Sequence, residues 1–169
     1  MFYKAPNQYI NEGKQFTVDG VTYPANWLNQ ATPEQKAALG LQEVVTTNQP
    51  FDPKYYWTGE TLEGATLTYT GTPKDLADVQ NQAVAQVNQT AYTLLLPTDW
   101  MAVKAFETGE AMAEGWATWR AAVRATASDT IASINEAADV DAVATVMKSI
   151  VWANDPNYVE PVEVEEIIS

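Results

Sequence analysis

The chain has 169 residues, and its 22 acidic against 9 basic side chains give a formal net charge of −13. A chain this acidic repels a phosphate backbone and has no cationic surface from which counterion-release binding could start, so we expect it to bind no nucleic acid. It contains neither cysteine nor histidine, which excludes disulfides, thiolate chemistry and the usual general base. No apolar stretch approaches the roughly 18 residues of a membrane span, and the first residues do not resemble a signal peptide. We therefore expect a cytoplasmic protein that binds no membrane.

The first part of the chain has the alternation and turn residues of a β-rich lobe. Residues 1–15 show little periodicity, so they could form an edge strand or a packed arm. From Gln15 to Tyr23, β-branched and aromatic residues flank Asp19-Gly20, a strong signal for a two-residue hairpin turn. Four side chains of this hairpin are expected to pack into the core: Phe16, Val18, Val21 and Tyr23.

A short helix and a third strand are expected after the hairpin. In Thr32-Pro-Glu-Gln35, the threonine can cap a helix, the proline suits its first position and the glutamine can answer the cap. Gly40 suits the left-handed residue that follows a last helical turn. Leu41 to Val45 is β-prone enough for the third strand, and Trp27-Leu28 supplies a buried anchor before the helix.

An aromatic cluster follows a turn-rich connector. Its members are Tyr55, Tyr56 and Trp57, and such a cluster can be core or contact surface. Ala65 to Thr70 then alternates large apolar residues with threonines, which predicts a half-buried strand. Gly71-Thr-Pro73 closes this first lobe by turn chemistry.

Beyond residue 73 the hydrophobic period changes from two to about 3.6, which predicts a helix of some twenty residues with an uncharged polar face. Pro97 breaks this helix, and a second helix restarts at Asp99-Trp100 and stops before Gly109. A third helix opens near Met112. The region therefore reads as a helical hairpin.

Alanines beyond this point allow helices to approach closely, and Asp139 caps a last helix that reaches Val151 or Trp152. We thus expect an α+β fold: a small N-terminal β-rich lobe with a short helix, followed by an antiparallel lobe of three to four helices. The expected domains are residues 1–72, residues 73–153 and an acidic C-terminal tail, residues 154–169.

Two tryptophans and the only two arginines lie at helical spacing in the third helix. A tryptophan stripe of this kind suits a core and also an interface. The arginines could pair with acids of the helical hairpin and fix its register, or could contact a partner's acids or carbonyls. The candidate partner-binding residues here are Trp116, Trp119, Arg120 and Arg124, and the acids within reach are Asp99, Glu107, Glu110 and Glu114.

The tail from Tyr158 to Ile168 alternates apolar residues, among them Val162 and Val164, with glutamates. One alternative is a solvated, disordered tail. The other is a strand that pairs with this protein's own sheet or adds to the edge of a partner's sheet, in which case both valines bind the partner.

Catalytic patterns are weak. The pairs Glu107/Glu110 and Asp139/Asp141 are expected by chance in so acidic a chain, and helix capping accounts better for the aspartates than calcium does. No phosphate loop, dinucleotide fingerprint or nucleophile elbow occurs. We expect no enzyme, no cofactor and no metal.

Two stretches resemble a known family. Pro97-Thr-Asp-Trp-Met101, followed by Glu114-Gly-Trp-Ala-Thr-Trp-Arg-Ala-Ala-Val-Arg124, resembles the "D-W then E-x-W-x-x-Y-R-x-x-L-R" pattern of bacteriophage tail assembly chaperones and tail-fibre assembly proteins. Trp119 stands in place of the pattern's tyrosine and Val123 in place of its leucine, and the acid-proline turn after the pattern is missing. Asp19–Leu28 and Thr32–Gly40 resemble "G-x-x-Y-P-x-x-W-L" and "T-x-E-E-x-x-A-L-G" phrases at the start of some such proteins.

This resemblance implies a chaperone or accessory protein that binds a phage tail-fibre or other tail protein, which can be a homotrimer, in the host cytoplasm during assembly. One alternative is a permanent structural subunit of a tail, fibre or baseplate, located in the virion. Another is an acidic DNA-mimic inhibitor, which would need clustered surface acids, whereas here only residues 160–166 are densely acidic.

Overall fold

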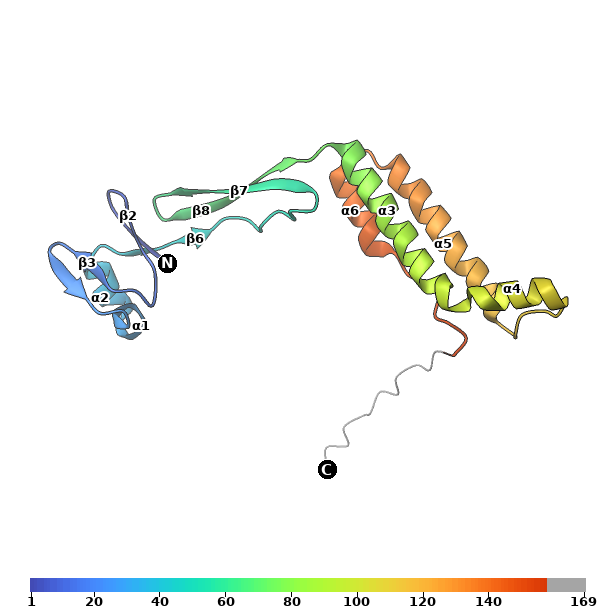
Figure 1. The fold of residues 1–169 in the computed structure, drawn as a ribbon. Coiled ribbons are helices and arrows are strands. Elements are labelled where there is room, and N and C mark those ends of the chain that lie inside the picture. Colours follow the sequence, from blue (N-terminus) through green and yellow to red (C-terminus); the bar gives the residue numbers. More distant parts are fainter. Residues whose placement is uncertain (158–169) are drawn as a thin grey trace, which may run out of the picture. The chain divides into compact units, whose positions relative to one another are not determined.

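The structure is a computed structural model that describes residues 1–157. It has a mixed α+β fold, 47% helical and 20% strand, in which short strands come first and several helices follow (Figure 1). The expected fold class is confirmed. The chain divides into two compact units, which we call unit 1, from Met1 to Pro73, and unit 2, from Lys74 onward.

The first residues of unit 1 form a small antiparallel sheet. β1 (Phe2–Lys4) is its middle strand, with β2 (Gln8–Ile10) on one side and β5 (Gln42–Glu43) on the other. Phe2 lies opposite Ile10 in one neighbour and opposite Glu43 in the other. Residues 1–15 therefore form strands rather than a packed arm, but only β2 is the expected edge strand of this sheet, because β1 is its middle strand.

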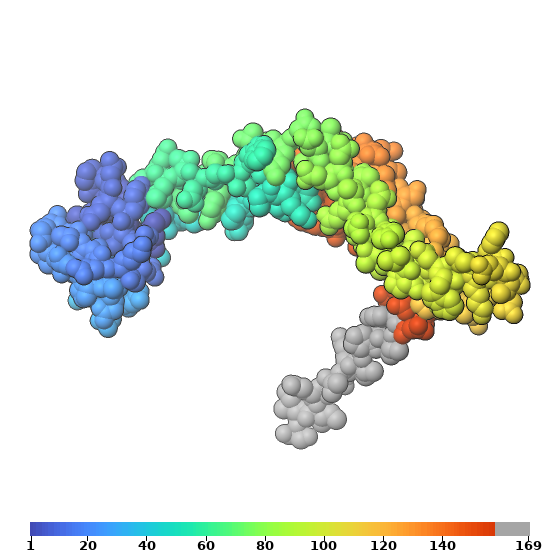
Figure 2. Space-filling model, viewed as in Figure 1, coloured from blue at the N-terminus to red at the C-terminus, as the bar shows by residue number. Residues whose placement is uncertain are grey.

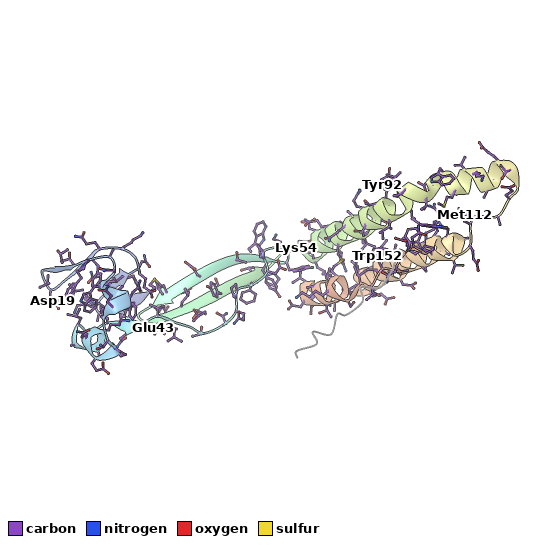
Figure 3. All side chains as sticks on the ribbon, turned by 90° about the horizontal axis from the view of Figure 1, so that it is seen from below. Asp19, Glu43, Lys54, Tyr92, Met112 and Trp152 are labelled. Carbon is purple, nitrogen blue, oxygen red and sulfur yellow. The ribbon has the colours of Figure 1, made fainter. Side chains whose placement is uncertain are left out.

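The expected hairpin is formed by β3 (Phe16–Val18) and β4 (Val21–Tyr23). Asp19 and Gly20 form its turn with φ of 50° and 81°, and Asp19 lies at its tip in Figure 3. Two consecutive residues with positive φ match the right-handed twist of the flanking strands, and this turn is favoured where aspartate precedes glycine.

The side chains of these strands share one hydrophobic core. Phe16 stacks on Tyr23 with ring centroids 5.1 Å apart, and Trp27 packs edge-on against both rings. Val21 was expected to pack with them, but it is 54% exposed, because it lies beside the turn on a strand with a single neighbour. The buried members of this core are Phe2, Ile10, Phe16, Val18, Leu28 and Leu41.

Two short helices, α1 (Trp27–Gln30) and α2 (Pro33–Ala38), follow the hairpin. The predicted capping box is confirmed: the Gln35 N–H donates to the Thr32 hydroxyl at 3.3 Å, and the Thr32 N–H donates to the Gln35 side chain at 2.8 Å. Gly40 adopts the expected left-handed conformation, with φ of 70°.

A longer hairpin completes unit 1. β7 (Tyr56–Glu63) and β8 (Thr66–Pro73) are eight residues each and antiparallel, and β6 (Val45–Thr46) runs parallel along the other side of β8. The prediction of one strand from Leu41 to Val45 is wrong, because that stretch divides between β5 and β6, which belong to different sheets. Neither β7 nor β8 has a buried side chain.

Three helices pack together in unit 2: α3 (Leu76–Leu95), α5 (Trp116–Glu136) and α6 (Val140–Ser149) (Figure 1). α3 is the expected helix of twenty residues. Side chains four residues apart lie on one face of a helix, and α3 buries such a series: Val79, Ala83, Val87 and Ala91.

Two helix boundaries in unit 2 differ from the expected ones. α5 begins at Trp116 rather than near Met112, because Gly115 has a left-handed φ of 81° that cannot continue a helix. α6 ends at Ser149, two or three residues before the expected end, because the Ile150 backbone is extended. The predicted cap of α6 is confirmed by the Asp139 carboxylate, which accepts a bond from the Ala142 N–H at 2.8 Å.

Candidate partner-binding surface

A 3₁₀ turn, η1 (Leu96–Thr98), joins α3 to the short helix α4 (Asp99–Thr108). The proline in this turn has no N–H with which to continue α3, so the backbone tightens and changes direction there. The Thr98 hydroxyl donates to the Leu95 carbonyl at 2.8 Å. α4 ends at Gly109, whose φ of 71° is the left-handed conformation that follows many helices.

Arg120 of α5 holds this join together. Its side chain is 4% exposed and donates to the Leu95 carbonyl at 2.8 Å, to the Thr98 hydroxyl, and to Asp99 Oδ1 at 2.6 Å. One planar guanidinium thus binds the end of α3, the turn and the first residue of α4. Of the two alternatives for Arg120, pairing within the chain is the correct one, and the partner acid is Asp99.

Two tryptophans lie on α5 beside Arg120. The rings of Trp116 and Trp119 meet edge-to-face with centroids 5.5 Å apart, and the buried Trp119 donates its indole N–H to the Ala153 carbonyl at 2.9 Å. This bond ties the segment after α6 to α5. Both tryptophans therefore pack within unit 2, and the indole N–H of Trp119 has a hydrogen-bond partner.

In contrast to α5, whose tryptophans pack within unit 2, the helix α4 has no buried residue. Trp100, Val103 and Phe106 recur every three residues and are 60%, 54% and 90% exposed; we call these three side chains the α4 stripe. Tyr92 of α3 is also exposed and points outward in Figure 3. In Figure 2 the yellow atoms of α4 and its following loop form one end of unit 2.

Another side of α4 faces the loop that follows it. Met101, Ala105 and Met112 line a hollow of about 100 Å³, which Trp100 of the α4 stripe also lines, and the Lys104 ammonium forms an ion pair with Glu110 there at 3.9 Å. Sites for drug-sized ligands usually have roughly 300 to 1,000 Å³, so this hollow is too small for such a ligand. The flexible side chains of Met101 and Met112 instead fill irregular space between α4 and the loop that follows it.

The chemistry available around α4 is apolar and aromatic. Along residues 1–157, no group of three or more His, Cys, Asp or Glu side chains could hold a metal ion. None of the helices in that part of the chain has the length and apolar content needed to cross a bilayer.

No family model, curated protein or solved structure matches this chain. An exposed row of large apolar side chains suits contact with another protein.

The structure separates the aromatic cluster that the sequence singled out. Tyr55 is buried at 8% exposure, Tyr56 is half-buried, and Trp57 is 69% exposed. Of the two alternatives, Tyr55 is therefore core and Trp57 is surface. Burial raises the pKa of the Tyr55 hydroxyl, and the negative charge of Asp52 adds to the effect.

The other candidate residues are also dispersed. Trp119 and Arg120 are buried, Trp116 is half-buried, and Arg124 is exposed with one long bond of 3.5 Å from its guanidinium to a backbone carbonyl. Val162 and Val164, with the rest of the tail for which a strand and a disordered segment were the two alternatives, lie outside the described residues. The α4 stripe itself was missed, although its regular spacing by three residues is visible in the sequence.

Proposed function

We propose that this chain is an assembly chaperone or accessory protein of a bacteriophage tail fibre or other tail protein, and that the α4 stripe is its contact surface. The residues that carry the family resemblance support this. Asp99 and Arg120 form the ion pair at the start of α4, and Trp116 and Trp119 pack beside Arg120. The shared pattern thus builds the platform that presents α4.

The observation that carries the proposal is a helix that buries nothing and exposes its largest apolar side chains. Most helices in proteins are stabilised by packing an apolar face, and isolated helices of this length are marginal in water. Two aromatic side chains of roughly 150 to 250 Å² each, exposed to this degree, leave about 300 Å² of ring surface open. At about 25 cal/mol/Å², covering it contributes roughly 7 kcal/mol before association costs.

The electrostatic setting narrows the kind of partner. Glu107 and Glu110 lie on and just after α4 and are exposed, in a chain of net charge −13. Such a surface repels nucleic acid and is compatible with an apolar protein surface bordered by neutral or basic residues. A folding tail or fibre subunit exposes such surface until its own interfaces close.

The test is co-expression with the tail or fibre protein encoded beside this chain. Phe106→Ser and Val103→Ser should reduce capture of that protein by the purified chain, with a loss for Phe106→Ser of about tenfold or more, because one buried aromatic contributes roughly 1.5 to 3 kcal/mol. Val151→Ser is the matched control, since Val151 is 83% exposed in unit 2 but is not on α4.

Both stripe variants should keep the melting temperature of the parent, because these side chains are exposed in the free protein. Capture equal to that of the Val151→Ser control would refute α4 as the contact surface. Mass spectrometry of purified particles separates the two roles: a fixed stoichiometry in the virion indicates a permanent subunit, and absence from it indicates a transient chaperone.

A further inference from the structure

The β7–β8 hairpin has two outer edges, and its register shows which backbone groups point out of each. Glu63 lies opposite Thr66 across a two-residue loop, so this pair exchanges hydrogen bonds directly. In an antiparallel ladder, bonded and non-bonded pairs alternate. The N–H and C=O groups of Thr58, Glu60 and Leu62 therefore point away from β8.

The outer edge of β8 is covered by its own chain. The Val45 N–H donates to the Ala65 carbonyl at 2.9 Å, and the Thr47 N–H donates to the Leu67 carbonyl at 3.0 Å. Beyond them the side-chain amide of Asn48 bonds both the N–H and the C=O of Tyr69, each at 2.8 Å, as a neighbouring strand would. These bonds also agree with the alternation deduced from the loop.

The outer edge of β7 has no such cover. Along residues 1–157 no strand pairs with it. Contacts lie toward its two ends, where the Tyr56 N–H donates to the Asp52 carbonyl at 3.0 Å and the Tyr9 hydroxyl donates to the Leu62 carbonyl at 3.3 Å. Thr58 and Glu60, further along, are exposed. A long exposed edge is a template for an added strand, and proteins that need no such strand usually block it.

We propose that the outer edge of β7 accepts an extended segment of another protein, with a lysine or arginine opposite Glu60. This goes beyond the proposed function, because it concerns unit 1 and does not involve the α4 stripe. The added segment exchanges main-chain bonds with Thr58, Glu60 and the Leu62 N–H. Residues 56–73 contain two glutamates and no basic residue, so an opposite charge on the incoming strand complements the hairpin.

The side-chain surroundings of Glu60 fit a long basic residue. Glu60 lies opposite Tyr69, and with Phe51 and Thr58 these residues line an open hollow of about 290 Å³. The aliphatic part of a lysine or arginine can pack on the two rings while its charged end meets the Glu60 carboxylate. The hollow thus gives the added strand a preferred register.

Charge argues against two other candidates for the added strand, a second copy of this chain and its own C-terminal residues. If two copies of this chain paired antiparallel through β7, the outward residues would face each other, and the register with most bonds would set Glu60 opposite Glu60. Residues 158–169 of this chain contain four glutamates and no basic residue, so they fit the edge equally poorly. The occupant is therefore a different chain.

Amide hydrogen exchange of the full chain, followed by NMR, tests this with two synthetic probes: the capped peptide Thr-Val-Thr-Lys-Thr-Val-Thr and the same peptide with glutamate in place of lysine. The lysine peptide should slow exchange at Thr58, Glu60 and Leu62 and bind about fivefold or more tightly than the glutamate peptide. Glu60→Lys should reverse that preference.

Thr58→Pro provides a second variant, because it removes an outward N–H that makes no bond to β8, and proline is tolerated at such edge positions. It should abolish protection by the lysine peptide while leaving the melting temperature unchanged. Equal protection by both peptides, protection elsewhere than β7, or none at millimolar peptide overturns the inference. These outcomes do not bear on the α4 stripe, because this experiment measures the binding of synthetic peptides to β7, whereas the test of the stripe measures the capture of a tail protein.

Discussion

Replacing Arg120 by alanine is the sharpest test of how unit 2 holds α4. The substitution removes three bonds at once, to the Leu95 carbonyl, the Thr98 hydroxyl and the Asp99 carboxylate. The Arg120 side chain is 4% exposed, so water has little access to the site. After the substitution, the Leu95 carbonyl and the Thr98 hydroxyl therefore lose a hydrogen-bond donor that water does not readily replace.

The magnitude follows from how each partner is exposed. Hydrogen bonds to a charged group contribute roughly 1.5 to 3 kcal/mol each when buried, and breaking a buried ion pair costs about 3 to 5 kcal/mol. Asp99 is 50% exposed, so water recovers much of its share and the estimate rests on the other two bonds. We expect Arg120→Ala to destabilise unit 2 by about 3 to 4 kcal/mol, which lowers its melting temperature by at least about 10 °C.

Urea denaturation followed by tryptophan fluorescence measures this, because Trp116 and Trp119 lie beside Arg120. Arg124→Ala is the matched control: it removes the other arginine, which is exposed and makes one bond of 3.5 Å, and it should cost less than about 0.5 kcal/mol. Arg120→Lys keeps the charge but not the planar fork, so it should fall between the two. Equal unfolding midpoints for Arg120→Ala and Arg124→Ala would refute the proposed role of Arg120.

Two further predictions concern unit 1. A Cβ on Gly71 would lie 2.5 Å from the ring of Phe51, so Gly71→Ala should lower the melting temperature more than Gly59→Ala, whose Cβ would meet the tip of a threonine side chain at 2.9 Å; equal losses would contradict the packing. Because its pKa is raised above 10.0 by burial and by Asp52, the Tyr55 hydroxyl stabilises the folded protein below that pH and this contribution is lost as the pH rises through the folded-state pKa. Tyr55→Phe should therefore lose less stability than the parent as the pH rises above 10.0, and a free energy of unfolding that falls equally with pH in both proteins would count against this.

Features set by neighbours in sequence were predictable. The Asp19-Gly20 turn and the capping box of Thr32 and Gln35 each involve partners within a few residues, so residue type and spacing are enough. The strand expected from Leu41 to Val45 failed because its pairing is not local: Gln42 and Glu43 join β1, while Val45 joins β8. Nothing in the five residues themselves distinguishes one long strand from two short ones.

The α4 stripe shows a second limit of sequence patterns. Trp100, Val103 and Phe106 have the spacing of side chains that face a core, and hydrophobic periodicity cannot distinguish a face that packs on its own chain from one that awaits a partner. The distinguishing fact is that α3, α5 and α6 pack with one another and bury side chains, whereas α4 buries none. Whether the stripe residues are buried depends on how the other helices pack, and this cannot be deduced from the ten residues of α4 alone.

The buried position of Arg120 changes how a binding defect at this site must be interpreted. Loss of Arg120 and loss of Phe106 should both weaken capture of a tail protein, but for different reasons: the first displaces the helix, and the second removes a contact. If Arg120 acts only by positioning α4, then adding Phe106→Ser to Arg120→Ala should weaken capture by less than Phe106→Ser does alone, because residues that act through the same element are not additive. Fully additive losses would instead place Arg120 in direct contact with the partner, which its exposure of 4% opposes.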